Sequence, residues 1–298
     1  MLEIKLILCP IDFSEFSIRA YQHALSLAEH YRAKVAVLHV VEISHYPYAD
    51  YVASTGDYAQ FCGALHAGGK EKLREFVTKQ MHNLIQPELV VQEGVAPDCI
   101  LSFAEARKAD LIVMGTHGRR GFDRLVLGSV TDRVMRRAAC PVIAISKLPR
   151  EPVAADVAAA GEKRRHVHHL SRILFCTDFS RNSERALHFA ASLAEEYDAE
   201  LTLLHVLEEV PSADMRQKAI ARATEQLDKL IAGKDRKFKT AVRIGKPFRE
   251  IIQLAEEMQI DLVAMGVSGR GALDRAVFGS TTYRVIQLGP CPVLAVHS

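Results

Sequence analysis

The sequence lacks an excess of charge and any long apolar run. Its 38 Lys and Arg residues nearly balance 36 Asp and Glu residues, for a formal net charge of +2. Surfaces for nucleic acid or anionic membranes carry a strong basic excess, so we expect neither partner. No stretch approaches the roughly 18 apolar residues of a membrane-spanning helix. Met1–Lys5 lead directly into a strand-like segment without signal-peptide features, so we expect a cytoplasmic protein.

Two familiar cysteine and glycine motifs are also missing. None of the six cysteines forms a C-x-x-C pair, and four of them lie within or beside apolar strand-like runs. This pattern predicts buried free thiols in a reducing compartment rather than a disulfide framework. There is no G-x-x-x-x-G-K-[ST], so no P-loop lysine is available for a nucleotide.

What the sequence does contain is an internal repeat, which indicates two copies of one structural unit. The matching segments are Ile7–Ser14 with Ile173–Ser180, Val37–Val40 with Leu203–Val206, Asp110–Gly115 with Asp261–Gly266, and Cys140–Val142 with Cys291–Val293. The offset falls from 166 residues early in the repeat to 151 late in it. The first copy therefore carries an insertion between Val40 and Gly94.

Each copy alternates short runs rich in Val, Ile and Leu with longer amphipathic stretches. The predicted strands are 4–9, 34–41, 88–93, 110–114 and 141–146 in the first copy, and 171–177, 199–206, 238–243, 261–265 and 292–297 in the second. Such apolar strands are typical of sheets covered on both faces, and the alternation indicates parallel strands with right-handed crossovers. The predicted fold is α/β, with two tandem doubly wound, Rossmann-like domains, each a five-stranded parallel sheet flanked by helices. Ala20, Ala24, Leu27 and Ala28 mark one face of the first helix, with Ser14 or Ser17 as its cap.

The predicted domains are 1–147 and 170–298, joined by a linker at 148–169. The linker holds Lys163–His166, His168 and His169, which indicate a solvated connector more readily than a metal site or basic arm. The insertion, at about 42–70, is rich in Tyr and His. Its Cys62 and His66 are weak evidence for a metal, and packing over a pocket, packing against the other copy or binding of an apolar ligand are the alternatives.

A glycine pattern, G-x-x-G-x9-G-S, follows the fourth predicted strand of each copy. It runs from Gly115 to Ser129 and again from Gly266 to Ser280, just before helical segments. Glycines permit positive φ and close approach of a ligand, and helix N-termini favour phosphate. Ser129, Thr131, Ser280 and Thr282 can add hydroxyl groups. One copy alone would be weak evidence, because a turn before a helix has the same composition.

Asp12 and Asp178 follow the first strand of each copy, at the sheet edge where ligands of such folds bind. The carboxylate can accept hydrogen bonds from a base or ribose, or help to hold a divalent ion. The alternative is that each aspartate caps the helix that follows.

Together these residues resemble the signature of universal stress protein domains, in order and twice, and the resemblance covers nearly the whole chain. It implies that each copy binds ATP, or ADP or AMP, with Mg²⁺ accompanying the nucleotide. It also implies that the two copies pair through their last strands, which is compatible with a further homodimer of chains. The implied nucleotide-binding residues are Pro10, Ile11, Asp12, Val40, Met114, Gly115, His117, Gly118, Gly128, Ser129, Val130 and Thr131 in the first copy. In the second copy they are Thr177, Asp178, Val206, Met265, Gly266, Ser268, Gly269, Gly279, Ser280, Thr281 and Thr282.

The predicted function is that of a nucleotide-binding regulatory protein in the stress response, without catalytic residues. No second carboxylate, lysine or arginine is fixed by a motif that would support phosphoryl transfer. His117 is interpreted as a phosphate or ribose contact rather than a general base. Arg119, Arg120 and Arg270 are either phosphate contacts or solvated loop residues. A slow ATP-hydrolysing or nucleotidyl-transferring enzyme remains the alternative.

Overall fold

A computed structural model describes residues 3–43, 58–80, 85–117, 127–146, 170–208, 212–232, 238–267 and 279–297. In the first half the elements are β1 (Leu6–Pro10), α1 (Glu15–Tyr31), β2 (Lys34–Val41), α3 (Tyr58–Gln80), β3 (Glu88–Glu93), α4 (Ala96–Ala106), β4 (Leu111–Gly115), α5 (Ser129–Arg137) and β5 (Val142–Ile145). In the second half they are β6 (Arg172–Cys176), α6 (Arg181–Glu196), β7 (Glu200–Leu207), α7 (Ala213–Ile231), β8 (Lys239–Ile244), α8 (Pro247–Glu257), β9 (Leu262–Gly266), α9 (Ser280–Leu288) and β10 (Val293–Val296). The predicted linker lies wholly outside the described residues, so the domain boundaries stay a prediction.

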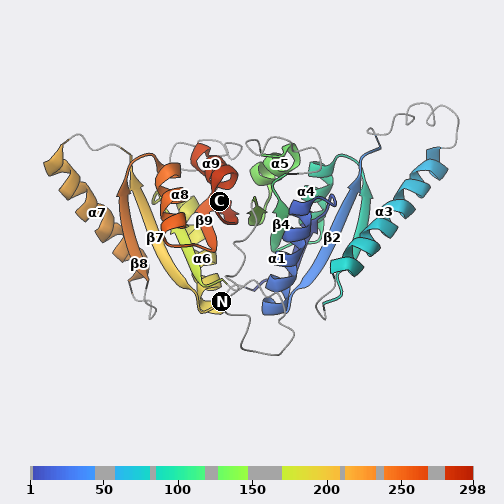
Figure 1. The fold of residues 1–298 in the computed structure, drawn as a ribbon, viewed down its shortest axis with the longest axis horizontal. Helices are drawn as coiled ribbons and strands as arrows, with labels where there is room; N and C mark the ends of the chain where they lie inside the picture. The colour runs from blue at the N-terminus through green and yellow to red at the C-terminus, as the bar shows by residue number, and fades with distance from the viewer. Residues whose placement is uncertain are drawn as a thin grey trace.

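The ten predicted strands are all present, each within two residues of its expected ends. The strand order is β3-β2-β1-β4-β5 in the first half and β8-β7-β6-β9-β10 in the second, with parallel neighbours within each half. This is the order 3-2-1-4-5 in both copies, and it confirms the doubly wound prediction. The last strands of the two halves, β5 and β10, pair antiparallel, with Leu294 opposite Ile143. The two parallel sheets therefore join into one ten-stranded sheet that crosses the whole molecule (Figure 1).

Helices cover both faces of this sheet, because strand side chains alternate between the faces. In β1, Ile7 and Cys9 belong to one apolar core and Leu8 belongs to the other. Helices α1, α3, α6 and α7 close the first core, and α4, α5, α8 and α9 close the second. Each core contains residues from both halves, so the halves share their apolar interior.

Serine caps decide where several helices begin. Ser14 Oγ accepts a hydrogen bond from Ser17 N at 3.2 Å, which resolves the two candidate caps of α1 in favour of Ser14. Ser180 caps α6 in the same way. At the other end, α1 stops at Arg32, which adopts a left-handed conformation with φ of 53°.

The expected insertion overlaps a helix that both halves share. With the 151-residue offset, α7 is equivalent to a segment that begins at residue 62, inside the range 42–70. Cys62 and His66 therefore lie on the common helix α3. Among the described residues, no group of three or more His, Cys, Asp or Glu is arranged to hold a metal ion.

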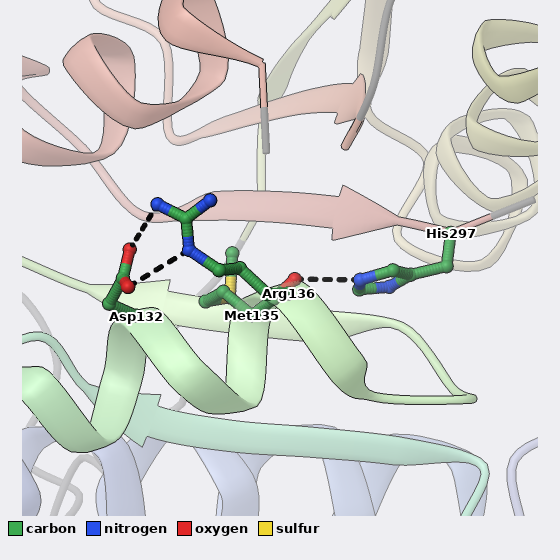
Figure 2. A network of polar contacts seen from close by, with 4 residues as sticks. All are labelled: Asp132, Met135, Arg136 and His297. Atoms are coloured by element: carbon green, nitrogen blue, oxygen red, sulfur yellow. Dashed lines mark hydrogen bonds and ion pairs between the residues drawn. The ribbon is translucent and has the colours of Figure 1, made fainter. Parts of the chain in front are cut away.

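A polar contact joins the end of the second half to α5 of the first. His297 Nε2 lies 2.6 Å from the main-chain oxygen of Met135, next to the Asp132–Arg136 ion pair (Figure 2). Because a carbonyl can only accept, Nε2 carries the proton in this contact. Nδ1, which would take a second proton, is buried and has no hydrogen-bond partner among the described residues. Burial is the main cause that lowers the pKa of His297 from 6.5, Arg185 lowers it further, and the Met135 carbonyl opposes both.

This contact predicts an acid-sensitive contribution to stability. The native pKa lies below the unfolded one, so the contribution is complete above about pH 6.5 and is lost as the pH falls towards the native pKa. His297→Gln keeps an N–H donor but does not titrate. Between about pH 7 and about pH 5, the free energy of unfolding of the wild type should fall more than that of the variant. Urea denaturation at both pH values measures the difference, and parallel losses would contradict the assignment.

Candidate functional site

The candidate site of each half lies where its strand order reverses. From β1 the chain proceeds outward to β2, whereas β4 lies on the other side of β1. In doubly wound sheets the connections that follow two such strands run to opposite faces, and the crevice between them at the carboxyl ends is the usual ligand position. The equivalent place in the second half lies between β6 and β9.

The turn after β1 is fixed by contacts to the neighbouring strand. Ile11 N donates to Leu38 O at 2.8 Å, and His39 Nδ1 donates to Ile11 O at 2.8 Å. The second half repeats both contacts, since Thr177 N donates to Leu204 O at 2.9 Å and His205 Nδ1 to Thr177 O at 2.8 Å. The histidines belong to the Leu-His-Val repeat, which was visible in the sequence, but their role was missed.

A left-handed phenylalanine follows the aspartate in both turns. Phe13 has φ of 65° and Phe179 has φ of 60°, a conformation that bulky residues rarely adopt. Each ring packs on the histidine of its half, with ring centres 4.6 Å and 4.4 Å apart. Such strain is retained only where the surroundings over-determine it, and it is commonest at functional sites.

The aspartates are held by this turn and do not cap the helices. Asp12 Oδ1 accepts from Ser14 N at 3.0 Å, and Asp178 Oδ1 accepts from Ser180 N at 3.0 Å. The caps of α1 and α6 are Ser14 and Ser180, so the capping alternative for Asp12 and Asp178 is wrong. Both carboxylates are partly exposed at the carboxyl edge of the sheet.

The first glycine of each loop is required for packing. A Cβ on Gly115 would lie 2.7 Å from Phe16 Cβ, and one on Gly266 would lie 3.0 Å from the main chain of Asn182. Helices α1 and α6 therefore cross the ends of β4 and β9 at a distance that only glycine allows. This close packing is a sufficient reason for glycine at these two positions, so a ligand is not needed to explain it.

The third glycine of each loop does not use positive φ. Gly128 has φ of −58° and Gly279 has φ of −60°, so the positive φ predicted as one reason for glycine is wrong at these positions. The reason at Gly128 is closeness, because its Cβ would lie 2.9 Å from Thr116 O. Gly128 N donates to that oxygen at 2.8 Å, and Gly279 N donates to Val267 O at 2.9 Å. The second glycines, Gly118 and Gly269, and Ser268 lie outside the described residues.

Helices α5 and α9 begin without a side-chain cap. Their N-caps are the glycines Gly128 and Gly279, in contrast to the serine caps of α1, α6 and α7. The first-turn N–H groups are thus left for another acceptor. The side chains of Ser129 and Ser280 are exposed beside these N–H groups, whereas Val130 and Thr281 are partly buried.

The two threonines of these helices bind the protein itself. Thr131 Oγ1 donates to Gly115 O at 2.8 Å, and Thr282 Oγ1 donates to Gly266 O at 3.0 Å. Both residues are 3% exposed. Their hydroxyl groups close the loop onto the strand, in place of the expected phosphate contact.

His117 is turned into the protein as well. The residue is 6% exposed, its Nδ1 lies 2.8 Å from Thr116 Oγ1, and its ring centre is 5.1 Å from that of Phe16. Direct contact of the ring with a phosphate or ribose does not fit this placement. The main-chain oxygen of His117 accepts a hydrogen bond from Ser14 Oγ at 3.3 Å. This bond connects the start of the glycine loop to the turn after β1.

The other predicted site residues offer main-chain rather than side-chain groups. Pro10, Ile11, Met114, Thr177 and Met265 are buried in the described structure. Val40 and Val206, at the ends of β2 and β7, pack against the core that α4, α5, α8 and α9 cover.

The two turns differ in how their hydroxyl groups are used. In the second half Ser180 Oγ donates to Asp178 Oδ1 at 2.6 Å, while in the first half Ser14 Oγ points to the glycine loop. Thr177 Oγ1 also accepts from Phe179 N at 2.9 Å, and Ile11 at the equivalent position has no such group. The second turn is therefore satisfied internally, and Asp12 keeps more acceptor capacity than Asp178.

The close approach at Gly128 predicts opposite effects for two glycine substitutions. Gly128→Ala places a Cβ against the Thr116 carbonyl and should lower the free energy of unfolding by roughly 1–3 kcal/mol. Gly68→Ala, on α3 where nothing lies within 4 Å, is the control and should raise it by roughly 0.5–1 kcal/mol. Urea denaturation measures both. A neutral Gly128→Ala would show that the loop relaxes freely.

Comparisons with known proteins agree with this architecture. The profile of the Universal stress protein family matches residues 3–146 and 169–297. A universal stress protein of Methanocaldococcus jannaschii is 36% identical over 147 residues, which are 49% of this chain and 85% of the relative. One from Mycobacterium tuberculosis is 26% identical over 277 residues, which are 88% of this chain and 87% of the relative. The crystal structure of a universal stress protein from Archaeoglobus fulgidus covers 99% of both chains with a TM-score of 0.74 and 23% identity. Because the family profile matches both halves in succession, the chain belongs to the universal stress protein family as a tandem, two-domain member.

Proposed function

We propose that each half binds an adenine nucleotide, ATP, ADP or AMP, and that the protein acts as a nucleotide-dependent regulator in the stress response. The observation that carries this proposal is the pairing of an uncapped helix N-terminus with a partly exposed aspartate across one crevice, in both halves. The N–H groups of α5 and α9 suit phosphate, because the helix dipole and the unpaired donors both favour an anion. The aspartate suits hydroxyl or amino donors of ribose or adenine.

In this proposal, main-chain groups make the larger part of the contact. Phosphates would meet the N–H groups of residues 128–131 and 279–282, and the adenosine would lie against the ends of β1 and β2 or of β6 and β7. Gly118, Ser268 and Gly269 remain part of the proposed site from the sequence. Mg²⁺ commonly takes one or two carboxylates, phosphate oxygens and water, so a single aspartate per site fits an ion that arrives with the nucleotide.

A regulatory role is favoured over catalysis by the charges around each crevice. In the described residues 11–14, 115–117 and 127–131, Asp12 is the only carboxylate, and no lysine or arginine is present. The described residues 177–180, 266–267 and 279–282 likewise offer only Asp178. Phosphoryl transfer needs several groups to neutralise charge and orient a nucleophile. Comparing ATP turnover with and without Mg²⁺ tests the alternative of a slow ATP-hydrolysing or nucleotidyl-transferring enzyme.

The proposed setting is the cytoplasm, with the nucleotide and other proteins as partners. Among the described helices, none is long and apolar enough to cross a membrane. Because β5 and β10 cover each other, the outer strands of the sheet are β3 and β8. A homodimer of whole chains would therefore use a surface other than the one that joins the two halves.

Calorimetric titration tests the binding itself. Ligand-free protein should bind ATP, ADP or AMP at one or two sites per chain, and binding should raise the unfolding temperature. GTP at equal concentration is the control for the base. No heat and no thermal shift with any adenine nucleotide would overturn the proposed function.

The difference between the two turns predicts that the first half binds more tightly. Asp12→Asn and Asp178→Asn are matched changes, since the amide oxygen can still accept from Ser14 N or Ser180 N. Asp12→Asn should weaken the tighter site by roughly 1–3 kcal/mol, because a charge-assisted hydrogen bond is lost. Asp178→Asn should leave the tighter site unchanged. If Asp178→Asn removed the tighter site instead, the order of the two sites would be reversed while binding itself stood.

A further inference from the structure

The two halves also meet through the C-terminal ends of α1 and α6, on the face opposite α5 and α9. His30 Nε2 lies 3.3 Å from Glu196 Oε1, and the two side chains are 30% and 27% exposed. The His30 ring stacks on Tyr197, with ring centres 4.1 Å apart and 16° between the planes. This contact between an imidazole and a carboxylate is therefore partly shielded from water.

His30 and Glu196 occupy the same position in the two copies of the repeat. The 166-residue offset makes Glu196 the equivalent of His30, and Tyr197 the equivalent of Tyr31. When two similar units are related by a twofold axis, a residue beside the axis meets its own equivalent. The His30–Glu196 contact therefore marks the axis that relates the two halves. At this position a true homodimer would bring two identical residues together.

The surroundings of Glu196 make a second negative charge there unfavourable. Burial is the main cause that raises the pKa of Tyr31, and the Glu196 carboxylate raises it further. Burial is also the main cause for Tyr197, with Tyr31 and Glu196 adding to it. Glu196 thus acts on both phenol groups from a half-buried position, where charges are screened less than in bulk water.

Strand pairing by itself does not distinguish the two halves. The paired strands read Val-Ile-Ala-Ile in β5 and Val-Leu-Ala-Val in β10, and they join through main-chain hydrogen bonds. A β5 edge would accept another β5, and a β10 edge another β10, almost equally well. Discrimination between like and unlike halves must come from side chains that differ at the axis.

We propose that the His30–Glu196 pair makes this surface selective for the opposite half. Two second halves would bring Glu196 against Glu196, and two first halves would bring His30 against His30, so both like pairings lose the complementary group. Two carboxylates brought together across an interface repel each other and suppress that wrong pairing, whereas the imidazole offers the Glu196 carboxylate a complementary group. The partner that this surface fits is the other half of the same chain. The chain closes on itself instead of joining equivalent halves of neighbouring chains.

The test places Lys or Glu at positions 30 and 196 of the full-length protein in all four combinations. The variants are His30→Lys, His30→Glu, His30→Glu with Glu196→Lys, and His30→Lys with Glu196→Lys. All four lose the stack of His30 on Tyr197, so differences among them report charge. Lys79→Glu, which changes an exposed ion pair with Glu75 on α3, is the control for a charge change elsewhere.

Both variants with opposite charges should keep the wild-type sedimentation behaviour at every protein concentration. Both variants with like charges should unfold at a temperature about 2–4 °C lower than the variants with opposite charges. They should also associate between chains as the protein concentration rises. The control should do neither. Equal behaviour of all four variants would overturn the proposal, and so would a response that failed to recover when both charges were exchanged.

Discussion

Strand β5 has β4 on one side, and its other edge is covered by β10 from the second half. An uncovered apolar edge of this kind would invite pairing with other chains. The antiparallel contact removes that edge, joins two parallel sheets and lets the apolar cores run through both halves. The positions of α5 next to α9, and of α1 next to α6, depend on this one pairing, as does the contact of His297 with Met135 (Figure 2).

The join between the halves consequently combines general and particular contacts. Main-chain hydrogen bonds and apolar packing supply cohesion that nearly any copy of the repeat could provide. His30, Glu196 and His297 supply polar contacts that exist only between unlike halves, since Ser146 stands where the first copy would place the equivalent of His297. A fused pair can hold different residues at equivalent positions, whereas the two subunits of a homodimer share one sequence.

The crevices show the same divergence between copies. Both keep the strained phenylalanine, the histidine tie and the uncapped helix, which together place a carboxylate opposite a cluster of N–H groups. They differ in a few hydroxyl groups, and those decide whether the turn is connected to the glycine loop or to its own aspartate. The two candidate sites therefore share one framework and differ in their hydroxyl contacts without any change of fold.

The sequence by itself determined the elements, the repeat and the sheet edge that carries the candidate site residues. Strands such as β2 and β3 were predicted to the residue, because apolar runs and their breaks are local properties. Gly128 and Asp12 were correctly placed in loops at the carboxyl edge, but the positive φ expected of that glycine and the capping alternative for that aspartate were wrong.

What only the tertiary structure decided are the directions of side chains and the partners they find across long distances in the chain. Thr131 and His117 looked like ligand groups in the sequence, yet one donates to a strand carbonyl and the other is buried beside Phe16. The meeting of His30 with Glu196 depends on where the axis between the halves passes. No local pattern encodes that position, because it results from packing contacts summed over the entire shared interior.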